Sequence, residues 1–309
     1  MRSDLVKVYV NDEDYKQYLD QHLRKEITRT NNIKEAHYII TGTLKGHEIT
    51  EHLKGVIIPF TGHNGIDIKA LKSHDVQLYN TTIHSRYVAE KALALTLALL
   101  GHVVYYHKKL EQGNWSKRTT PERLPWVTLQ HKTVGIYGYG RIGRFLHDYL
   151  KPFNVDVYVI DRGKDYGSAK TVKNLTNLVQ VSDVIIIAAP LSKETEGVFN
   201  QAILEQMVDK FLVNVGRGKI IDEYDLYQAL KNKTLRGFAS DVWYTYPKSE
   251  DVVYPSKYPI HEFEEVVMTP HSGGHTEQSK TEMMAYVTET LHQIYEGDTS
   301  RSLDLNTLK

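Results

Sequence analysis

The chain has 309 residues, a length that suggests two domains, each able to bury a core of its own. Lysine and arginine number 38 together, as do aspartate and glutamate, so no basic field is present and we expect no nucleic-acid partner. The absence of cysteine excludes disulfides, thiolate catalysis and cysteine-ligated zinc, although it only permits a reducing compartment.

No segment has the pattern of a secretion signal or of a membrane span. The first residues contain no long apolar run, so we expect a cytoplasmic protein. The most apolar stretch, residues 92–106, is too short for a bilayer, and Glu90 and Lys108 bracket it. A buried helix is expected there, and no membrane partner.

Short β-rich runs alternate with helical patterns in the first part of the chain. The expected strands are residues 5–10, 37–41, 56–59 and 77–79. The expected helices are residues 12–23, 48–53 and 67–72. This alternation predicts a small α/β domain of the flavodoxin-like kind, followed by one long helix over residues 85–112 and a polar stretch at 116–125.

Residues 134–143 are the most informative segment, because a β-branched run there enters the pattern GxGxxG. Gly138 permits the tight turn, Gly140 lets the backbone approach a pyrophosphate, and Gly143 lets helix and strand pack closely. The helix that opens at Arg141 directs unpaired N–H groups and the positive end of its dipole at phosphates. This segment predicts a dinucleotide-binding turn.

The strand that follows this turn, residues 155–160, leads to an acidic residue, Asp161. Its carboxylate can accept hydrogen bonds from both hydroxyls of an adenosine ribose, and it would repel a 2′-phosphate. NAD is therefore the expected cofactor. The Arg162 guanidinium could bind such a phosphate, which leaves NADP as the less favoured alternative.

The alternation resumes after Asp161. The expected strands are residues 184–189, 211–215, 237–241 and 266–268, and the expected helices are residues 201–207, 223–231 and 277–295. The last helix is long enough to return to the first domain, and residues 303–306 belong with that domain. We expect a substrate domain of residues 1–98 and 286–309, a dinucleotide-binding domain of residues 99–285, and a cleft between them. Residues 244–264 contain three prolines and are expected to form a long loop over that cleft.

A series of motifs in this order resembles the D-isomer-specific 2-hydroxyacid dehydrogenases, which include phosphoglycerate, glyoxylate/hydroxypyruvate and formate dehydrogenases. The motifs are YVAE at 87–90, the fingerprint, SD at 182–183, APL at 189–191, NVGRG at 214–218, DV at 241–242 and TPHSGG at 269–274. The resemblance covers nearly the whole chain. It implies two Rossmann-like domains, one flavodoxin-like and one doubly wound, in a homodimer that interconverts 2-oxo acids and D-2-hydroxy acids with NAD.

This chemistry needs a cation to hold the carboxylate and a group to move the hydroxyl proton. Arg217, between Gly216 and Gly218 after a predicted strand, matches the family's substrate-binding arginine. Its planar guanidinium can pair with a carboxylate at two points. His271, which follows residues 269–270 at another strand end, matches the acid/base histidine of the family.

Tyr246 departs from the family pattern. Relatives usually carry a glutamate there, hydrogen-bonded to the catalytic histidine, and the formate branch carries a glutamine. A neutral phenol can orient an imidazole but cannot stabilise its charged form by Coulomb attraction. Tyr246 is therefore expected either to orient His271 or to pack under the loop while another group holds the ring.

The resemblance also implies contacts in the first domain. Residues 61–65 match a glycine-rich loop whose N–H groups bind the substrate carboxylate in relatives, so Gly62 and His63 are candidate substrate residues; the alternative is a plain strand-to-helix turn. His84 stands where the formate branch has an asparagine and is a candidate too, against a solvated histidine at a helix start.

The remaining cofactor contacts also follow from the resemblance. Asp241 is expected near the nicotinamide carboxamide. The other implied contacts are Ile142, Ala189, Pro190, Thr195, Val215, Gly216 and Gly274. No spacing of histidines with acidic residues resembles a metal site.

Three functions are compatible with these residues. The first is an NAD-dependent reductase of a 2-oxo acid. A formate-type dehydrogenase is the alternative enzyme, favoured by Tyr246 and the DVW sequence at 241–243, with the histidine at position 84 against it. An NAD-sensing regulatory protein is the third, and the presence of Arg217 and His271 argues against it.

Overall fold

The computed structural model describes residues 5–63, 65–115, 125–248 and 252–308. Two compact units are present, Met1–His84 with His275–Lys309, and Ser85–Gly274. The expected boundaries, after residues 98 and 285, fall inside helix α3 (Ser85–Leu100) and helix α9 (Ser279–Glu296). Each helix stays whole because its apolar side chains enter a single core. The second unit lies between the two parts of the first in sequence.

The first unit contains a five-stranded parallel sheet in the order β2-β1-β3-β4-β5. Its strands are β1 (Val6–Val10), β2 (Ile27–Arg29), β3 (Tyr38–Ile40), β4 (Gly55–Ile58) and β5 (Gln77–Asn80). Its α-helices in the described residues are α1 (Glu13–His22), α2 (Ile68–Ser73) and α9. One core joins α1 and α9 to the sheet, and a second core holds α2.

Two features of the first unit differ from the sequence-based expectation. Strand β2 was not predicted, because only three residues form it at the edge of the sheet. The helix predicted over residues 48–53 is wrong: a 3₁₀ turn, Gly46–Glu48, is followed by a tight turn in which the Leu53 amide bonds the Thr50 carbonyl. Leu53, which follows this 3₁₀ turn, is buried.

The second unit contains a seven-stranded parallel sheet in the order β12-β11-β10-β9-β6-β7-β8. Its strands are β6 (Thr133–Tyr137), β7 (Asp156–Ile160), β8 (Lys170–Val172), β9 (Val184–Ile187), β10 (Lys210–Asn214), β11 (Leu235–Ser240) and β12 (Val266–Met268). The strand order reverses at β6, because β7 lies on one side of it and β9 on the other. Ligands of open α/β sheets bind at this kind of reversal, outside the carboxyl ends of the strands.

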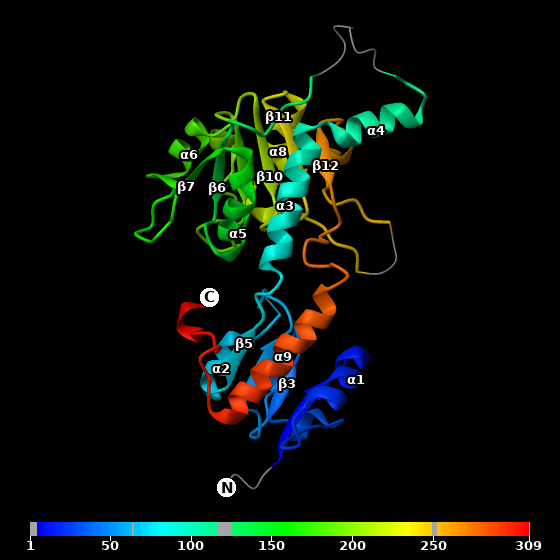
Figure 1. Ribbon diagram of the computed structural model, residues 1–309, viewed down its shortest axis with the longest axis vertical. Helices are drawn as coiled ribbons and strands as arrows, with labels where there is room; N and C mark the ends of the chain where they lie inside the picture. Colours follow the sequence, from blue (N-terminus) through cyan, green and yellow to red (C-terminus); the bar gives the residue numbers. More distant parts are fainter. Residues whose placement is uncertain (1–4, 64, 116–124, 249–251, 309) are drawn as a thin grey trace. The chain divides into compact units, whose positions relative to one another are not determined.

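Helices cover both faces of this sheet, as a doubly wound fold requires (Figure 1). Helix α3 and helix α5 (Arg141–Leu150) share one core with the strands. Helices α6 (Leu175–Val181), α7 (Gln201–Leu204) and α8 (Glu223–Lys231) contribute to a separate core with them. The predicted pair of Rossmann-like α/β units is thus confirmed.

The single long helix expected over residues 85–112 is wrong. Helix α3 ends at Leu100, and helix α4 (Val103–Glu111) starts after His102, whose φ of 52° lies in the left-handed region. One left-handed residue ends the helical hydrogen-bond pattern, and the two axes meet at a bend of 58°. Across the described residues, no single helix is both long and apolar enough for a bilayer; only this bent pair together has the length and composition.

Candidate active site

The GxGxxG segment forms the turn between β6 and α5. Gly138 has a φ of 105°, and a Cβ there would lie 2.4 Å from the Ala189 nitrogen. A Cβ on Gly143 would lie 2.5 Å from the Gly138 oxygen, so the helix rests directly on the turn. At Gly140, by contrast, a Cβ would meet no atom within 4 Å. The turn is therefore closed on its protein side and open at Gly140, which fits the approach of a pyrophosphate.

The start of α5 and the end of β7 complete this region. Helix α5 begins at Arg141, and its N-cap residue is Gly140, which has no side chain to bind the leading N–H groups. Those groups suit an anion. Asp161 follows β7 and is exposed; its Oδ1 accepts a hydrogen bond from the Gly163 amide at 2.9 Å, which orients the carboxylate. Arg162 is exposed beside it. The residues present fit a dinucleotide.

The loop after β9 is closed by its own hydrogen bonds. The Thr195 hydroxyl donates to the Pro190 carbonyl at 2.8 Å and accepts from the Ser192 amide at 2.8 Å. Thr195 therefore shapes the predicted cofactor loop through contacts to its backbone.

The turn that carries Arg217 is held by a buried asparagine. Asn214 accepts from the Gly216 amide at 3.0 Å and donates to the Arg217 carbonyl at 3.0 Å. The Arg217 guanidinium donates through Nη1 to the Gly216 carbonyl at 2.7 Å. A Cβ on Gly216 would lie 2.5 Å from the Ala189 oxygen, so this turn touches the loop after β9, and Val215 is buried beneath it.

His271 lies in a tight turn after β12. Its φ is 56°, and its amide donates to the Thr269 carbonyl at 3.0 Å. The buried Asp241 carboxylate holds this turn: Oδ1 accepts from the Thr269 hydroxyl at 2.6 Å and the Ser272 amide at 2.9 Å, and Oδ2 accepts from the Gly273 amide at 2.8 Å. The sequence assigned Asp241 to the nicotinamide. In the structure its carboxylate organises the turn of His271, a role the sequence analysis missed.

Tyr246 lies beside His271. The two ring centres are 5.4 Å apart with 47° between the planes, and the Tyr246 hydroxyl accepts from the Trp243 amide at 3.0 Å. Burial raises the pKa of this hydroxyl; Asp241 adds to the rise, and the Trp243 amide and Arg217 oppose it. The phenol is therefore neutral at physiological pH. Tyr246 therefore contacts the ring of His271, and the charges of Arg217 and Asp241 act on its hydroxyl.

Three candidate substrate residues, Gly62, His63 and His84, belong to the first unit. Gly62 and His63 follow β4 and are half-buried, and the His63 carbonyl accepts from the Ile66 amide at 3.0 Å. Residue 64 of the same loop lies outside the described residues. His84 is half-buried as well: burial lowers its pKa, His275 lowers it further, and Glu282 opposes both.

Asn214 and Trp243 belong to motifs that the sequence analysis quoted without giving either residue a role. Asn214 is the last residue of β10, and a polar residue at the end of an apolar strand was a signal that could have identified it. Gly274, an expected cofactor contact, is the last residue of the second unit. Among the described residues, no cluster of three or more metal-binding side chains occurs.

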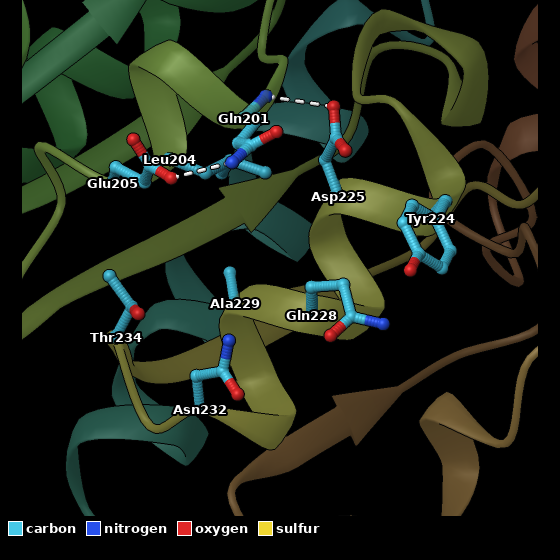
Figure 2. Close-up of a pocket in the computed structure, with 9 residues that line it drawn as sticks. All are labelled: Gln201, Leu204, Glu205, Tyr224, Asp225, Gln228, Ala229, Asn232 and Thr234. Atoms are coloured by element: carbon cyan, nitrogen blue, oxygen red, sulfur yellow. Dashed lines mark hydrogen bonds between the residues drawn. The ribbon is translucent and has the colours of Figure 1, made fainter.

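A separate hollow of about 270 Å³ lies between α7 and α8 (Figure 2). None of the predicted site residues lines it. Its polar groups already bind one another. The Gln201 backbone N–H donates to the Asp225 carboxylate at 2.8 Å, and the Gln201 side-chain amide donates to the Glu205 carboxylate at 2.7 Å (Figure 2). The hollow therefore adds no residue to the site at the edge of the sheet.

Known proteins resemble this chain over most of its length. It is 31% identical over 88% of its length to D-3-phosphoglycerate dehydrogenase of Haemophilus influenzae, of which it spans 66%, just under two thirds. It is 30% identical over 86% of its length to a mitochondrial formate dehydrogenase of Oryza sativa subsp. japonica, covering 72% of that protein. The crystal structure of NAD-dependent formate dehydrogenase from Staphylococcus aureus in complex with NAD superposes with a TM-score of 0.75 at 26% identity, covering 97% of this chain and 98% of that one.

A family model agrees with these relatives. The model for the NAD-binding domain of D-isomer specific 2-hydroxyacid dehydrogenases matches residues 93–273, more than half of the chain. The resemblance inferred from the motifs is confirmed. The chain carries the NAD-binding domain of a family of oxidoreductases. The chain belongs to the family of D-isomer specific 2-hydroxyacid dehydrogenases.

Proposed function

We propose that this protein reduces a 2-oxo acid to a D-2-hydroxy acid with NADH, and catalyses the reverse oxidation. The observation that carries the proposal is the grouping of Arg217, Tyr246 and His271 within one unit. The turns of all three follow parallel strands of the sheet that also bears the GxGxxG turn. A carboxylate-binding cation and a titratable imidazole are the two groups that the reaction needs.

Each side chain has a role in this proposal. The Arg217 guanidinium binds the substrate carboxylate in two-point fashion and polarises the 2-oxo group, while its Nη1 also bonds the Gly216 carbonyl. His271 donates a proton to the oxygen in reduction and removes it in oxidation. When bound, the nicotinamide supplies or accepts the hydride. The Tyr246 ring limits the orientations of the imidazole.

The proposal extends to the first unit. The loop with Gly62 and His63 would bind the substrate carboxylate through backbone N–H groups, and His84 would contact the substrate. Both assignments rest on the family resemblance. The half-buried position of these residues is compatible with them.

We propose NAD rather than NADP as the cofactor, because the Asp161 carboxylate would repel a 2′-phosphate. In Asp161→Ala, NADH should bind more weakly and the difference in kcat/KM between NADH and NADPH should narrow, since two hydrogen bonds and a repulsion are lost together. Steady-state kinetics with both cofactors measure this. A wild-type preference for NADPH would instead assign the discrimination to Arg162.

The activity is tested by NADH consumption across a panel of 2-oxo acids that differ in side-chain size and charge, with formate plus NAD as a control. Oxo-acid turnover that is lost in His271→Gln supports the proposal. Formate oxidation without oxo-acid reduction would favour the second candidate, a formate-type dehydrogenase. The neutral Tyr246 and the similarity to formate dehydrogenases support this candidate. NADH binding without either turnover would favour a sensor of NAD.

The proposal includes a homodimer, which the family resemblance implies. Two exposed apolar side chains of α4, Val103 and Leu110, are compatible with a contact between copies. Sedimentation equilibrium of the purified protein measures its oligomeric state directly. A monomer at micromolar concentration would contradict the proposed homodimer.

A further inference from the structure

Trp243 is the only one of the three tryptophans whose side chain is buried. It is 6% exposed, whereas Trp115 is 78% and Trp126 is 60% exposed. Trp243 follows β11, and its ring packs edge-on against Phe238 with 6.4 Å between centres. A buried indole N–H normally has a hydrogen-bond partner, so the identity of that partner shows what this side chain holds.

The partner of the Trp243 indole belongs to the turn of His271. Nε1 donates to the Thr269 carbonyl at 2.8 Å, and the same carbonyl accepts from the His271 amide at 3.0 Å. The backbone of His271 has a φ of 56°, a region that is unfavourable for a residue with a Cβ. Two hydrogen bonds therefore converge on the carbonyl oxygen from which this strained turn begins.

The backbone of Trp243 contacts the other two parts of the site. Its amide donates to the Tyr246 hydroxyl at 3.0 Å. Its carbonyl oxygen lies 2.3 Å from where a Cβ on Gly218 would stand, so the turn that carries Arg217 packs directly on it. One residue thus contacts the turn of the arginine, the tyrosine beside the histidine, and the turn of the histidine itself.

We propose that Trp243 is a positioning residue, whose indole N–H fixes the backbone turn that aims His271. The inference rests on the proposed function, since it assigns no activity of its own to Trp243. The Asp241 carboxylate binds the Thr269 hydroxyl and the amides after His271, whereas the indole binds the carbonyl before it. The turn is therefore held on both sides of the histidine.

The first test is Trp243→Phe, which keeps an aromatic ring but removes the donor, with the exposed Trp115→Phe as the matched control. We expect kcat for 2-oxo acid reduction to fall about tenfold or more in Trp243→Phe, with KM for NADH within about twofold of wild type. The solvent deuterium isotope effect on kcat should rise, because proton donation from a misaligned His271 becomes slower relative to the other steps. Trp115→Phe should change neither quantity.

A loss of folded protein would also lower kcat, so the number of active sites is counted by titration with NADH, whose own fluorescence reports binding. A fall in kcat that matches the lost sites, with an unchanged isotope effect, would show a structural role only and overturn the proposal. A second variant avoids the change of ring size. In a Trp115→Phe, Trp126→Phe background, benzothienylalanine replaces Trp243 and exchanges the indole N–H for sulfur with almost the same shape.

Wild-type kcat and isotope effect in the benzothienylalanine protein would also overturn the proposal. His271→Gln distinguishes this failure from a failure of the proposed function. If His271→Gln is inactive while the protein without the indole donor works normally, only the role of Trp243 is wrong. If His271→Gln keeps full oxo-acid turnover, the proposed function itself is wrong and the positioning role falls with it.

Discussion

Arg217 has its carbonyl and its guanidinium tied to the turn that carries it. The Nη1 bond to the Gly216 carbonyl at 2.7 Å fixes the plane of the guanidinium, and Asn214 fixes the backbone below it. A planar group held in this way can present its remaining donors to a carboxylate without losing further side-chain freedom. A lysine at the same position would keep the charge but lose this preorganisation.

We therefore expect kcat/KM for a 2-oxo acid to fall in Arg217→Lys by about 100-fold or more, about 2.7 kcal/mol of transition-state stabilisation. NADH affinity should change little, because the substitution leaves the GxGxxG turn intact. Steady-state kinetics and an NADH titration measure the two effects. Near-normal kcat/KM in a folded variant would remove Arg217 from the site.

Tyr246 provides a prediction about pH. Burial raises the pKa of its hydroxyl, so the phenol itself adds no negative charge beside His271 at working pH. In Tyr246→Glu a carboxylate would stabilise the imidazolium, which is the form that donates a proton in reduction. Because the protonated form would then persist to higher pH, the descending limb of kcat/KM should move upward by about one pH unit, about 1.4 kcal/mol.

The check is the pH profile of oxo-acid reduction for wild type and Tyr246→Glu. Activity at the optimum can fall too, because the side chains differ in length and shape. A limb that stays in place in a folded, active variant would mean that the introduced carboxylate does not act on His271.

The case of Asp241 shows where prediction from single residues ends. The motif located this aspartate correctly at the end of a strand, but its hydrogen-bond donors come from residues 269–273, in a loop that follows a different strand. Position in the sequence gives neither the direction of a side chain nor its partners. The hydrogen bond from the Trp243 indole to the Thr269 carbonyl could not be predicted from the sequence for the same reason.

At the scale of the elements, successive loops touch along the carboxyl edge of the second sheet. Glycines occupy the points of contact, since a Cβ would lie 2.4 Å from an Ala189 atom at Gly138, 2.5 Å from one at Gly216, and 2.3 Å from one of Trp243 at Gly218. A Cβ at Gly273 would lie 2.9 Å from an Asp241 oxygen. The loops after β6, β9, β10, β11 and β12 therefore form one continuous set of contacts.

Two glycines of the fingerprint should respond differently to the same substitution. Gly138→Ala places a Cβ against Ala189 at a φ of 105°, so we expect a loss of about 2 kcal/mol or more in the free energy of unfolding. Gly140→Ala places its Cβ in open space and should leave stability within about 0.5 kcal/mol of wild type while NADH binds much more weakly.

Denaturant unfolding and NADH titration of both variants separate these effects. Normal NADH affinity in Gly140→Ala would show that no pyrophosphate approaches that position. Wild-type stability in Gly138→Ala would contradict the packing at Ala189.

Strands that are buried throughout were predicted from the sequence, whereas helix α6 was not predicted, although three of its residues are buried. Strands such as β4 and β9 are buried throughout, and their β-branched runs identified them. Strands β2 and β8 were missed, because each has three residues at an edge of its sheet and only a weak pattern. The break at His102 was missed because a left-handed histidine inside an apolar helical pattern leaves no periodic signal.

At the scale of the whole molecule, the two units differ in how the chain builds them. The second unit is one continuous segment, Ser85–Gly274, whereas the first unit needs two segments far apart in sequence. Its core combines Val8, Val10 and Tyr79 with Val287 and Leu291 of α9. The amide of Leu303 also bonds the Leu78 carbonyl at 2.7 Å, beside the β5 edge of the sheet.

We therefore expect residues 85–274 expressed alone to unfold cooperatively and to bind NADH. Residues 1–84 alone should lack a cooperative transition, because the α9 part of their core is missing, and adding residues 275–309 as a separate peptide should restore it. Thermal unfolding followed by circular dichroism measures all three samples. A cooperative transition of residues 1–84 alone would contradict this dependence.

The split first unit has a consequence for synthesis on the ribosome. Strands β1 to β5 are translated before any residue of the second unit. The apolar face of their sheet that α9 covers stays exposed until residues 279–296 have left the exit tunnel. The second unit can fold during this interval, since its chain is continuous. The first unit is thus begun before the second unit and completed after it, and its uncovered sheet is the surface on which chaperones would act.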